Sequence, residues 1–193
     1  MYFKKLVFEI ATICILLLTV CESAKPTEQQ NSLGKVLILY YTWSGQANTE
    51  KAAKIIQGLT GADMIRIEPA TPFPANFTER EMITWVGEQR EKQARPEIKD
   101  LGLNPASYDF IFIGTPVWFG TVSLPIETLL LKIDFGGKPV ACFAMANSNE
   151  RDVLSNFKKL VKNAKVRDGI AFRMRDETEV ESKITQWVNA IQR

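Results

Sequence analysis

Apolar runs and amphipathic stretches alternate along most of the chain. Three nearly continuous apolar runs, at 35–41, 108–113 and 138–146, have the composition of parallel strands that are buried on both faces. The run at 62–68 alternates like a strand with one more polar face. The run at 166–174 carries charges near its start and is expected to be an edge strand.

Between these runs, apolar residues recur every three or four positions, which predicts helices. Five helices are expected, near 48–60, 78–95, 123–132, 150–164 and 178–191. Asn48 is expected to cap the first helix. Thr78 and Glu81 have the spacing of a capping box, and Thr178 and Glu181 have the same spacing before the last helix. The alternation of strands and helices predicts a doubly wound α/β fold with a five-stranded parallel sheet and helices on both faces.

The start of the chain has the composition of a signal peptide. A lysine pair at 4–5 precedes an apolar run at 10–20, which is about half of the length needed to span a bilayer. We therefore expect residues 1–21 to be an export signal, 22–33 a polar linker and 34–193 one globular domain.

The apolar run ends in Leu18-Thr19-Val20-Cys21, which resembles a bacterial lipobox. The resemblance implies that Cys21 is diacylated and becomes the first residue of the mature protein. The alternative is an ordinary cleaved signal, in which Cys21 is only another apolar residue. Both interpretations predict export to the cell envelope, and the first predicts a lipoprotein anchored to the membrane on its periplasmic or extracellular face.

Composition narrows the chemistry that the domain can carry out. Hydrophobic residues make up 46% of the chain and charged residues 24%, as in ordinary globular domains. The net charge is +2 and no run of Lys and Arg reaches five residues, so nucleic-acid binding by a basic patch is not expected. Histidine is absent and only three cysteines occur, which excludes histidine-based triads and leaves a zinc site unsupported. We therefore expect a bound cofactor to supply any reactivity, and Cys142 to be a buried core residue.

Ligands of open α/β sheets bind outside the carboxyl ends of the strands. The segments that leave strands one, three and four are 42–49, 114–120 and 146–150, and none contains Lys or Arg. The first segment combines hydroxyls, a glycine and the start of a helix, which suits a single phosphate held by neutral donors. The alternative is a capped strand-to-helix turn that binds nothing.

Aromatic residues in the segment 114–120 indicate a planar ligand. We expect this segment to be a loop, in which glycines flank Trp118 and Phe119. A ligand stacked on these rings would explain why they are outside the core, and Trp43 could flank the same ligand from the other side. The alternatives are that both rings pack beneath the loop or form a protein-contact patch.

At these residues the sequence resembles the flavodoxin family, over nearly the whole predicted domain. Thr42, Ser44 and Gly45 fall in the register of the family's FMN-phosphate loop. Residues 108–130 resemble its third strand, isoalloxazine loop and following helix, and 91–98 resemble a helix end of a bacterial subgroup. The resemblance implies FMN as the cofactor and a sheet with strand order 2-1-3-4-5.

The resemblance also implies which residues hold the cofactor. They are Thr42, Trp43, Ser44, Gly45, Gln46, Ala47, Asn48 and Thr49 in the first segment, Thr115, Pro116, Val117, Trp118, Phe119 and Gly120 in the second, and Asn147, Ser148 and Asn149 in the third. Trp43 and Trp118 would stack near the isoalloxazine ring. No side chain is implied as a catalytic acid or base, and no residue as a metal ligand.

Three functions are consistent with these features. The first is an electron carrier that binds a redox partner protein transiently, and the second is an enzyme that passes electrons from NAD(P)H or another protein to a quinone-like substrate. The third is a flavodoxin fold without cofactor that serves as a surface binding module, because Gln46 and Ala47 displace Asn48 and Thr49 from the family pattern. The balanced charge and the Pro-rich segment 69–77 favour the enzyme. The oligomeric state is open, with a homodimer as one alternative.

Overall fold

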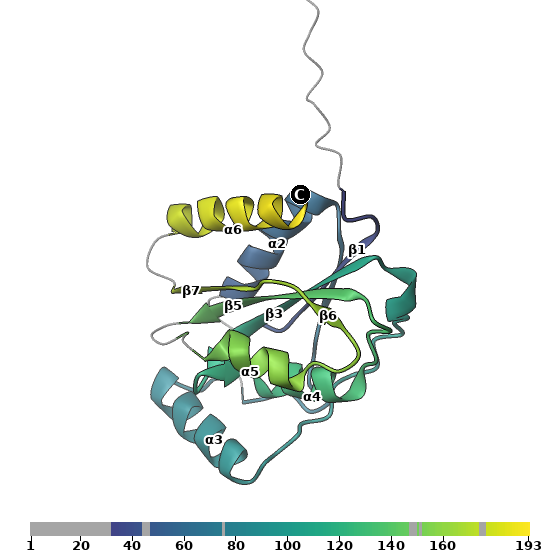
Figure 1. Cartoon of the computed structure of the whole chain (residues 1–193). Helices are drawn as coiled ribbons and strands as arrows, with labels where there is room; N and C mark the ends of the chain where they lie inside the picture. The colour runs from purple at the N-terminus through teal and green to yellow at the C-terminus, as the bar shows by residue number, and fades with distance from the viewer. Residues whose placement is uncertain (1–31, 44–46, 75, 147–149, 151, 174–176) are drawn as a thin grey trace, which may run out of the picture. The chain divides into compact units, whose positions relative to one another are not determined.

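The computed structural model describes residues 32–43, 47–74, 76–146, 150, 152–173 and 177–193. Within them, seven strands form one sheet with the main order β2-β1-β3-β5-β6 (Figure 1). The strands are β1 (Val36–Tyr40), β2 (Asp63–Arg66), β3 (Phe110–Trp118), β4 (Thr121–Val122), β5 (Pro139–Ala146), β6 (Lys165–Val166) and β7 (Ile170–Arg173). β4 is antiparallel, and β6 and β7 can be counted as one interrupted strand. The five parallel strands, numbered again along the chain, then have the order 2-1-3-4-5. The predicted doubly wound α/β fold is therefore confirmed.

Alternate residues of the central strands pack on opposite faces of the sheet. In β1, Leu37 and Leu39 join one apolar cluster, whereas Val36, Ile38 and Tyr40 join the other. Successive side chains of a strand point to opposite sides, so an unbroken apolar run supplies both faces at once. This is why the run at 35–41 forms a central strand, which pairs with β2 on one side and β3 on the other.

Helices cover both faces of the sheet (Figure 1). α2 (Asn48–Thr60) and α6 (Glu177–Ile191) lie on one face, and α4 (Leu124–Lys132) and α5 (Val153–Leu160) lie on the other. α3 (Glu79–Glu91) packs on the side of α4 and α5 and projects beyond them in Figure 1. Among the described residues, no helix combines the length and the apolarity needed to cross a membrane.

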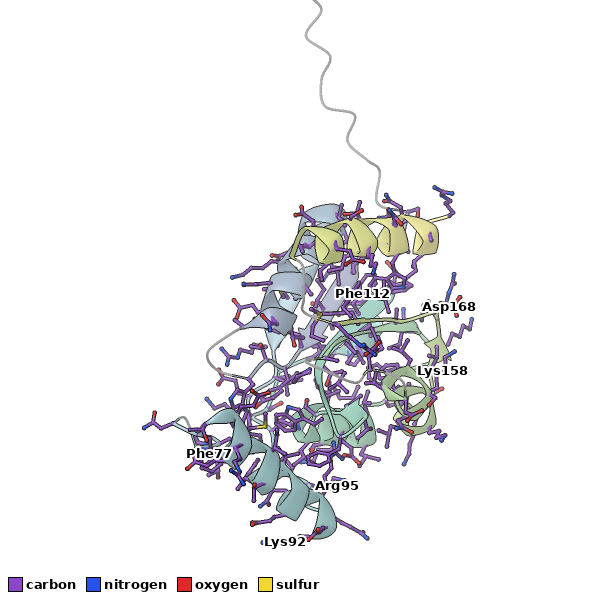
Figure 2. All side chains as sticks on the ribbon, turned by 90° about the vertical axis from the view of Figure 1, so that its left-hand side faces the viewer. Phe77, Lys92, Arg95, Phe112, Lys158 and Asp168 are labelled. Atoms are coloured by element: carbon purple, nitrogen blue, oxygen red, sulfur yellow. The ribbon has the colours of Figure 1, made fainter. Side chains whose placement is uncertain are left out.

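A short 3-10 helix, η1 (Pro105–Ser107), precedes β3. Further along β3, Phe112 lies beneath α6 in Figure 2, and its ring meets that of Trp187 with centroids 5.4 Å apart. Aromatic side chains thus fill part of the layer between the sheet and this helix. The layer on the other face contains Cys142, which is buried as predicted, and burial raises the pKa of its thiol.

The first turn of α3 has the predicted capping box. The backbone N–H of Glu81 donates to Thr78 Oγ1 (3.3 Å), and the backbone N–H of Thr78 donates to the Glu81 carboxylate (2.8 Å). These bonds satisfy N–H groups that have no partner within the helix. α2 ends at Gly61 with φ +66°, a left-handed conformation that suits glycine.

Several helix boundaries differ from the predicted ones. Ala47 precedes α2 with φ +49°, so Asn48 is the first helical residue and not its cap. α6 begins at Glu177, so Thr178 lies inside the helix. α5 spans only Val153–Leu160 and α3 ends at Glu91, so both helices are shorter than predicted.

The segment 114–120 was predicted to be a loop, but most of it belongs to a strand. β3 continues to Trp118, and its last part pairs with β5 up to Pro116 and Met145. The chain then turns at Phe119 (φ +55°) and Gly120 (φ +73°) into β4. The prediction failed because Gly114 interrupts the apolar run. This glycine is needed for packing, since a Cβ there would lie 2.2 Å from Phe143 Cζ.

The predicted edge strand at 166–174 is split into β6 and β7. Both pair with β5, and Val166 faces Val140 while Ile170 faces Phe143. Three residues of the edge therefore face two of β5, which is the arrangement of a β-bulge. Gly169 lies in the bulge, where a Cβ would approach Cys142 O to 2.7 Å.

Candidate functional site

An open cleft lies at the carboxyl ends of β1, β3 and β5, where open α/β sheets bind ligands. It consists of two adjoining cavities of about 200 and 480 Å³, which share Glu79, Met82, Pro116 and Met145. We call the smaller one the helix-end cavity, because the start of α2 bounds it. The larger one is the hairpin cavity, bounded by the turn between β3 and β4.

Two threonines give the helix-end cavity unused hydrogen-bond donors. Thr42 follows β1 and Thr49 lies in the first turn of α2, and these residues are only 4% and 1% exposed. Neither hydroxyl forms a hydrogen bond with another described residue. A ligand with acceptor oxygens in this cavity could accept a hydrogen bond from each hydroxyl.

The start of α2 adds backbone donors to the same cavity. The first hydrogen bond within the helix runs from the Lys51 N–H to the Ala47 carbonyl (2.9 Å), so the N–H groups of Thr49 and Glu50 have no partner inside the helix. The helix dipole also places positive potential there. Among the described residues, no Lys or Arg lines either cavity. The cavity thus fits one phosphate held by neutral donors.

The hairpin cavity is the broader of the two, and polar and apolar atoms line it about equally. One wall is the end of β3 and its turn, from Pro116 to Gly120, and the opposite wall is α3 through Glu79, Met82 and Ile83. At the opening, Phe119 is 59% exposed and Ile83 48% exposed. Phe119 also adopts a left-handed backbone conformation, which is costly for a residue with a Cβ. A slot with these walls suits a planar ring system.

Trp43 and Trp118 lie next to each other instead of on opposite sides of a slot. Trp118 is 5% exposed and meets Trp43 edge to face, with centroids 5.8 Å apart. It meets Tyr41 in the same way at 5.7 Å, and Trp43 stacks on Phe73 at 6.2 Å. This arrangement leaves no slot for a planar ligand between the two tryptophan rings. Both still line the cleft, so stacking of either ring on a cofactor stays a prediction.

Ion pairs fix the far end of α3 to the body of the domain. Glu127 of α4 is buried and lies 3.3 Å from Arg90 and 2.9 Å from Arg95. Arg90 also donates to the Val122 carbonyl of β4 (2.6 Å). Burial lowers the pKa of Arg90, and the Glu127 carboxylate opposes this effect. Arg90 therefore joins the two walls of the hairpin cavity, α3 and the β3–β4 hairpin.

Comparison with known proteins identifies the family. Residues 35–191 match the family model of flavodoxin. The chain belongs to the flavodoxin family. A flavoprotein of Lactobacillus acidophilus NCFM, solved in complex with FMN, is 27% identical, with a TM-score of 0.63 over 77% of this chain and 97% of that one.

Two further structures resemble this flavodoxin. The apo form of the Lactobacillus acidophilus flavoprotein is 28% identical, with a TM-score of 0.58 over 77% of this chain and 95% of that one. A Bacteroides eggerthii DSM 20697 protein, for which a flavoprotein assignment has been proposed, is 24% identical, with a TM-score of 0.66 over 82% of this chain and 98% of that one. No curated protein matches the chain. The family resemblance seen in the sequence is confirmed.

Most of the predicted cofactor residues that can be placed in this flavodoxin line the cleft. They are Thr42, Trp43, Ala47, Asn48, Thr49, Pro116, Val117, Trp118, Phe119 and Gly120. Ser44, Gly45, Gln46, Asn147, Ser148 and Asn149 lie outside the described residues, as does Cys21. The described part of the chain contains no group of three or more acidic or cysteine side chains that could hold a metal ion.

Thr115 does not reach the cleft, contrary to the prediction. It is fully buried and accepts a hydrogen bond from the Ser123 N–H (2.9 Å), while its hydroxyl donates to the Pro116 carbonyl (2.9 Å). Its hydroxyl is used to fasten the start of α4 to β3. A predicted ligand contact is in this case an internal hydrogen bond.

The sequence did not predict that α3 forms a wall of the site. Glu79, Met82 and Ile83 line the hairpin cavity, together with Asp152 before α5. Met82 is half-buried, so part of its side chain faces the cavity. The exposed Ile83, on a helix face that is otherwise polar, is the one sequence signal that could have indicated a second apolar contact.

Proposed function

We propose that this chain is a redox protein that works through bound FMN. One observation carries the proposal: a single cleft joins the hydroxyls of Thr42 and Thr49, which have no hydrogen-bond partner among the described residues, to a broad slot lined in part by aromatic and apolar side chains. The first feature suits a phosphate and the second a planar ring system. The flavodoxin family and the FMN complex of the Lactobacillus acidophilus protein support FMN as the occupant.

The residues of the chain bind and orient this cofactor. Thr42 and Thr49 would donate to the phosphate, together with N–H groups of the first turn of α2. The segment from Pro116 to Gly120 and Met82 would enclose the ring. When bound, FMN supplies the hydride or electron transfer, which the protein's own side chains do not.

Two carboxylates in the hairpin cavity would tune the cofactor. Glu79 and Asp152 both line this cavity, and no Lys or Arg among the described residues lines it. A negative charge repels electrons added to a nearby ring, so these side chains would lower the reduction potential of FMN.

The opening of the hairpin cavity favours an enzyme that reduces a small quinone-like molecule. Phe119 and Ile83 form an exposed apolar edge, on which a neutral planar acceptor could lie. An electron carrier is the second candidate, because the same edge could contact a redox partner protein.

Cofactor binding is tested first. The full chain is purified in detergent, stripped of flavin and titrated with FMN while the flavin fluorescence is followed. We expect saturable quenching and a shifted visible spectrum. FMN that stays fully fluorescent would contradict both redox candidates and leave the cofactor-free binding module.

Turnover separates the two redox candidates. FMN-loaded protein is mixed with NADH and a soluble quinone, and NADH oxidation is measured. Oxidation that depends on both FMN and quinone supports the enzyme. FMN binding without such turnover supports the electron carrier.

We also propose that residues 1–21 direct export and that Cys21 is lipidated. The support is the lysine pair, the apolar run and the lipobox-like end of the sequence. In a bacterial host fed labelled palmitate, the wild type should carry label and Cys21→Ala should not, with Cys14→Ala as the matched control. Equal label on Cys21→Ala and the wild type would contradict lipidation at this residue.

A further inference from the structure

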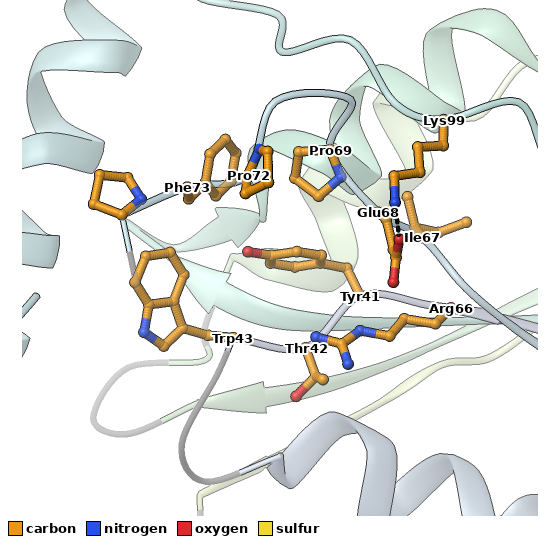
Figure 3. A pocket seen from close by; sticks show the side chains of 11 residues that line it. Tyr41, Thr42, Trp43, Arg66, Ile67, Glu68, Pro69, Pro72, Phe73 and Lys99 are labelled. Carbon is orange, nitrogen blue, oxygen red and sulfur yellow. Dashed lines mark hydrogen bonds and ion pairs between the residues drawn. The ribbon is translucent and has the colours of Figure 1, made fainter. Parts of the chain in front are cut away.

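A second pocket of about 230 Å³ lies beside the cleft, at the carboxyl ends of β1 and β2 (Figure 3). Its lining residues are Tyr41, Thr42, Trp43, Arg66, Ile67, Glu68, Pro69, Pro72, Phe73, Pro74 and Lys99. We call it the proline pocket. Thr42 and Trp43 also line the helix-end cavity, so the pocket and the cleft share one wall.

The walls of the proline pocket are flat, apolar and fixed in place. In Figure 3 the Tyr41 ring lies between the prolines on one side and Arg66 on the other. The proline-bearing segment is held by two backbone bonds, from the Ala70 N–H to Glu97 O and from the Lys99 N–H to Glu68 O (2.8 Å each). Proline also fixes its own φ. The pocket is therefore preformed for a flat ring.

Two side chains of the pocket form no hydrogen bond or ion pair with another side chain among the described residues. Tyr41 is 5% exposed, and its hydroxyl forms no hydrogen bond with another described residue. Burial raises the pKa of this phenol, although Arg66 opposes the effect, so the hydroxyl stays a donor at neutral pH. Arg66 forms no ion pair within the described residues, whereas Lys99 is paired with Glu68 at 2.6 Å.

The lining residues therefore carry one unbalanced positive charge. In Figure 3 the Arg66 guanidinium lies on the Thr42 side of the Tyr41 ring. A guanidinium can bind a carboxylate through two parallel hydrogen bonds. A ring with one carboxylate would match both the flat walls and this charge.

We propose that the proline pocket binds a small aromatic carboxylate with a single ring. Its ring contacts the aromatic and proline walls, and its carboxylate reaches past the edge of the Tyr41 ring to pair with Arg66. The volume is below that of pockets for drug-sized ligands, about 300 Å³ or more, which limits the ligand to one ring. Because the pocket shares only a wall with the cleft, this ligand and FMN are bound side by side and do not compete.

Benzoate is the probe for this site. It is titrated by calorimetry into the full chain in detergent, both free of flavin and loaded with FMN. Benzamide has the ring without the charge, and cyclohexanecarboxylate has the charge without the flat ring. We expect saturable binding of benzoate in both forms of the protein, and at least about tenfold weaker binding of each comparator.

Substitutions assign the binding to this pocket. Arg66→Gln should weaken benzoate at least about tenfold, because a charge-assisted hydrogen bond is lost. Arg66→Lys should recover part of the affinity, and Tyr41→Phe should weaken benzoate while keeping the ring wall. Arg167→Gln is the matched control, since Arg167 is exposed and lies in the bulge on the opposite edge of the sheet.

Three results would overturn the proposal. One is the absence of saturable heat at millimolar benzoate. Another is displacement of benzoate by FMN or inorganic phosphate, which would place the anion in the helix-end cavity. The third is equal benzoate affinity in Arg66→Gln and Arg167→Gln. Benzoate binding to a chain that fails to bind FMN would contradict the proposed redox function alone and support the proline pocket.

Discussion

Gly114 lies where β3 passes closest to a side chain of β5. A Cβ at this position would be 2.2 Å from Cζ of Phe143, whose side chain is fully buried. A Cβ at Gly58, on the exposed side of α2, would contact no other atom within 4 Å. Two glycines that look alike in the sequence therefore have opposite roles. One is required by packing, and the other only loosens a helix.

This contrast predicts opposite effects of alanine at the two positions. Gly114→Ala should lower the free energy of unfolding by about 1–3 kcal/mol, because the core must shift to accept a methyl group. Gly58→Ala should raise it by about 0.5–1 kcal/mol, because alanine favours the helix. Urea denaturation of both variants measures this. A Gly114→Ala variant as stable as the wild type would show that β3 and β5 are less tightly packed.

The capping box of α3 predicts a pH dependence. Backbone and side-chain hydrogen bonds from Thr78 hold the pKa of Glu81 below its ordinary value. The folded pKa is thus below the unfolded pKa, so the contribution is complete above the ordinary glutamate pKa of about 4.3 and is lost as the pH falls through the folded pKa. The difference in urea midpoint between wild type and Glu81→Gln should shrink below about pH 4. A constant difference would contradict the role of the charge.

Roles of single residues were the least predictable part of the site. Thr42 and Thr115 both follow buried parts of strands, and both were expected to contact the cofactor. Thr42 lines the cleft and its hydroxyl bonds to no other described residue, whereas the Thr115 hydroxyl is hydrogen-bonded to Ser123 and Pro116. The sequence shows that a donor is present, but the packing around it decides whether a ligand can reach it.

Among the elements that form the cleft, α3 is held to the core by few buried residues. Its first residues wall the hairpin cavity, and only Val86 in it is fully buried. Phe77 precedes its first turn and Lys92 follows its last, at opposite ends of the helix in Figure 2. The ion pairs of Glu127 fasten the end near Lys92. The position of the cavity wall therefore depends on contacts at the far end of the helix.

Loss of this buried carboxylate should affect stability and binding together. Glu127→Gln leaves Arg90 without a counterion and should cost about 3 kcal/mol of unfolding free energy. It should also weaken FMN binding, because the wall formed by α3 is released. Glu179→Gln, which breaks the exposed pair with Lys183, is the control and should cost under about 0.5 kcal/mol. Equal effects of the two substitutions would exclude a positioning role for Glu127.

The elements themselves were largely predictable, because apolar periodicity reflects burial directly. The runs at 35–41 and 138–146 became β1 and β5 within one residue at each end. The continuation of β3 through Pro116 was not predictable, since it depends on β5 being long enough to pair with it. The bulge between β6 and β7 likewise depends on register with a neighbour, which no local pattern contains.

For the whole molecule, the charge of the cleft is the property that bears most on redox chemistry. Carboxylates line the hairpin cavity, and the described lining includes no Lys or Arg. Asp152 is one of them, whereas Asp168 lies outside the cleft lining, between β6 and β7 at the edge of the sheet. Removing the two charges separately tells a local effect from a change in net charge.

Asp152→Asn should raise the midpoint potential of bound FMN, because a negative charge near the ring is removed. Asp168→Asn changes the net charge equally and should leave the potential unchanged, since distance and salt screen its charge. A spectroelectrochemical titration of both FMN-loaded variants measures the shift. Equal shifts in the two variants would contradict a local effect of the cleft.

The assignment of the helix-end cavity to the phosphate of FMN is tested most directly by one comparison. The affinity of the full chain for FMN is compared with its affinity for riboflavin, which lacks the phosphate. We expect FMN to bind more tightly, and the double variant Thr42→Ala/Thr49→Ala to lose at least about tenfold of this preference. Thr60→Ala, at the other end of α2, should keep the preference unchanged. Equal affinity for FMN and riboflavin in the wild type would contradict the assignment of the helix-end cavity to the phosphate.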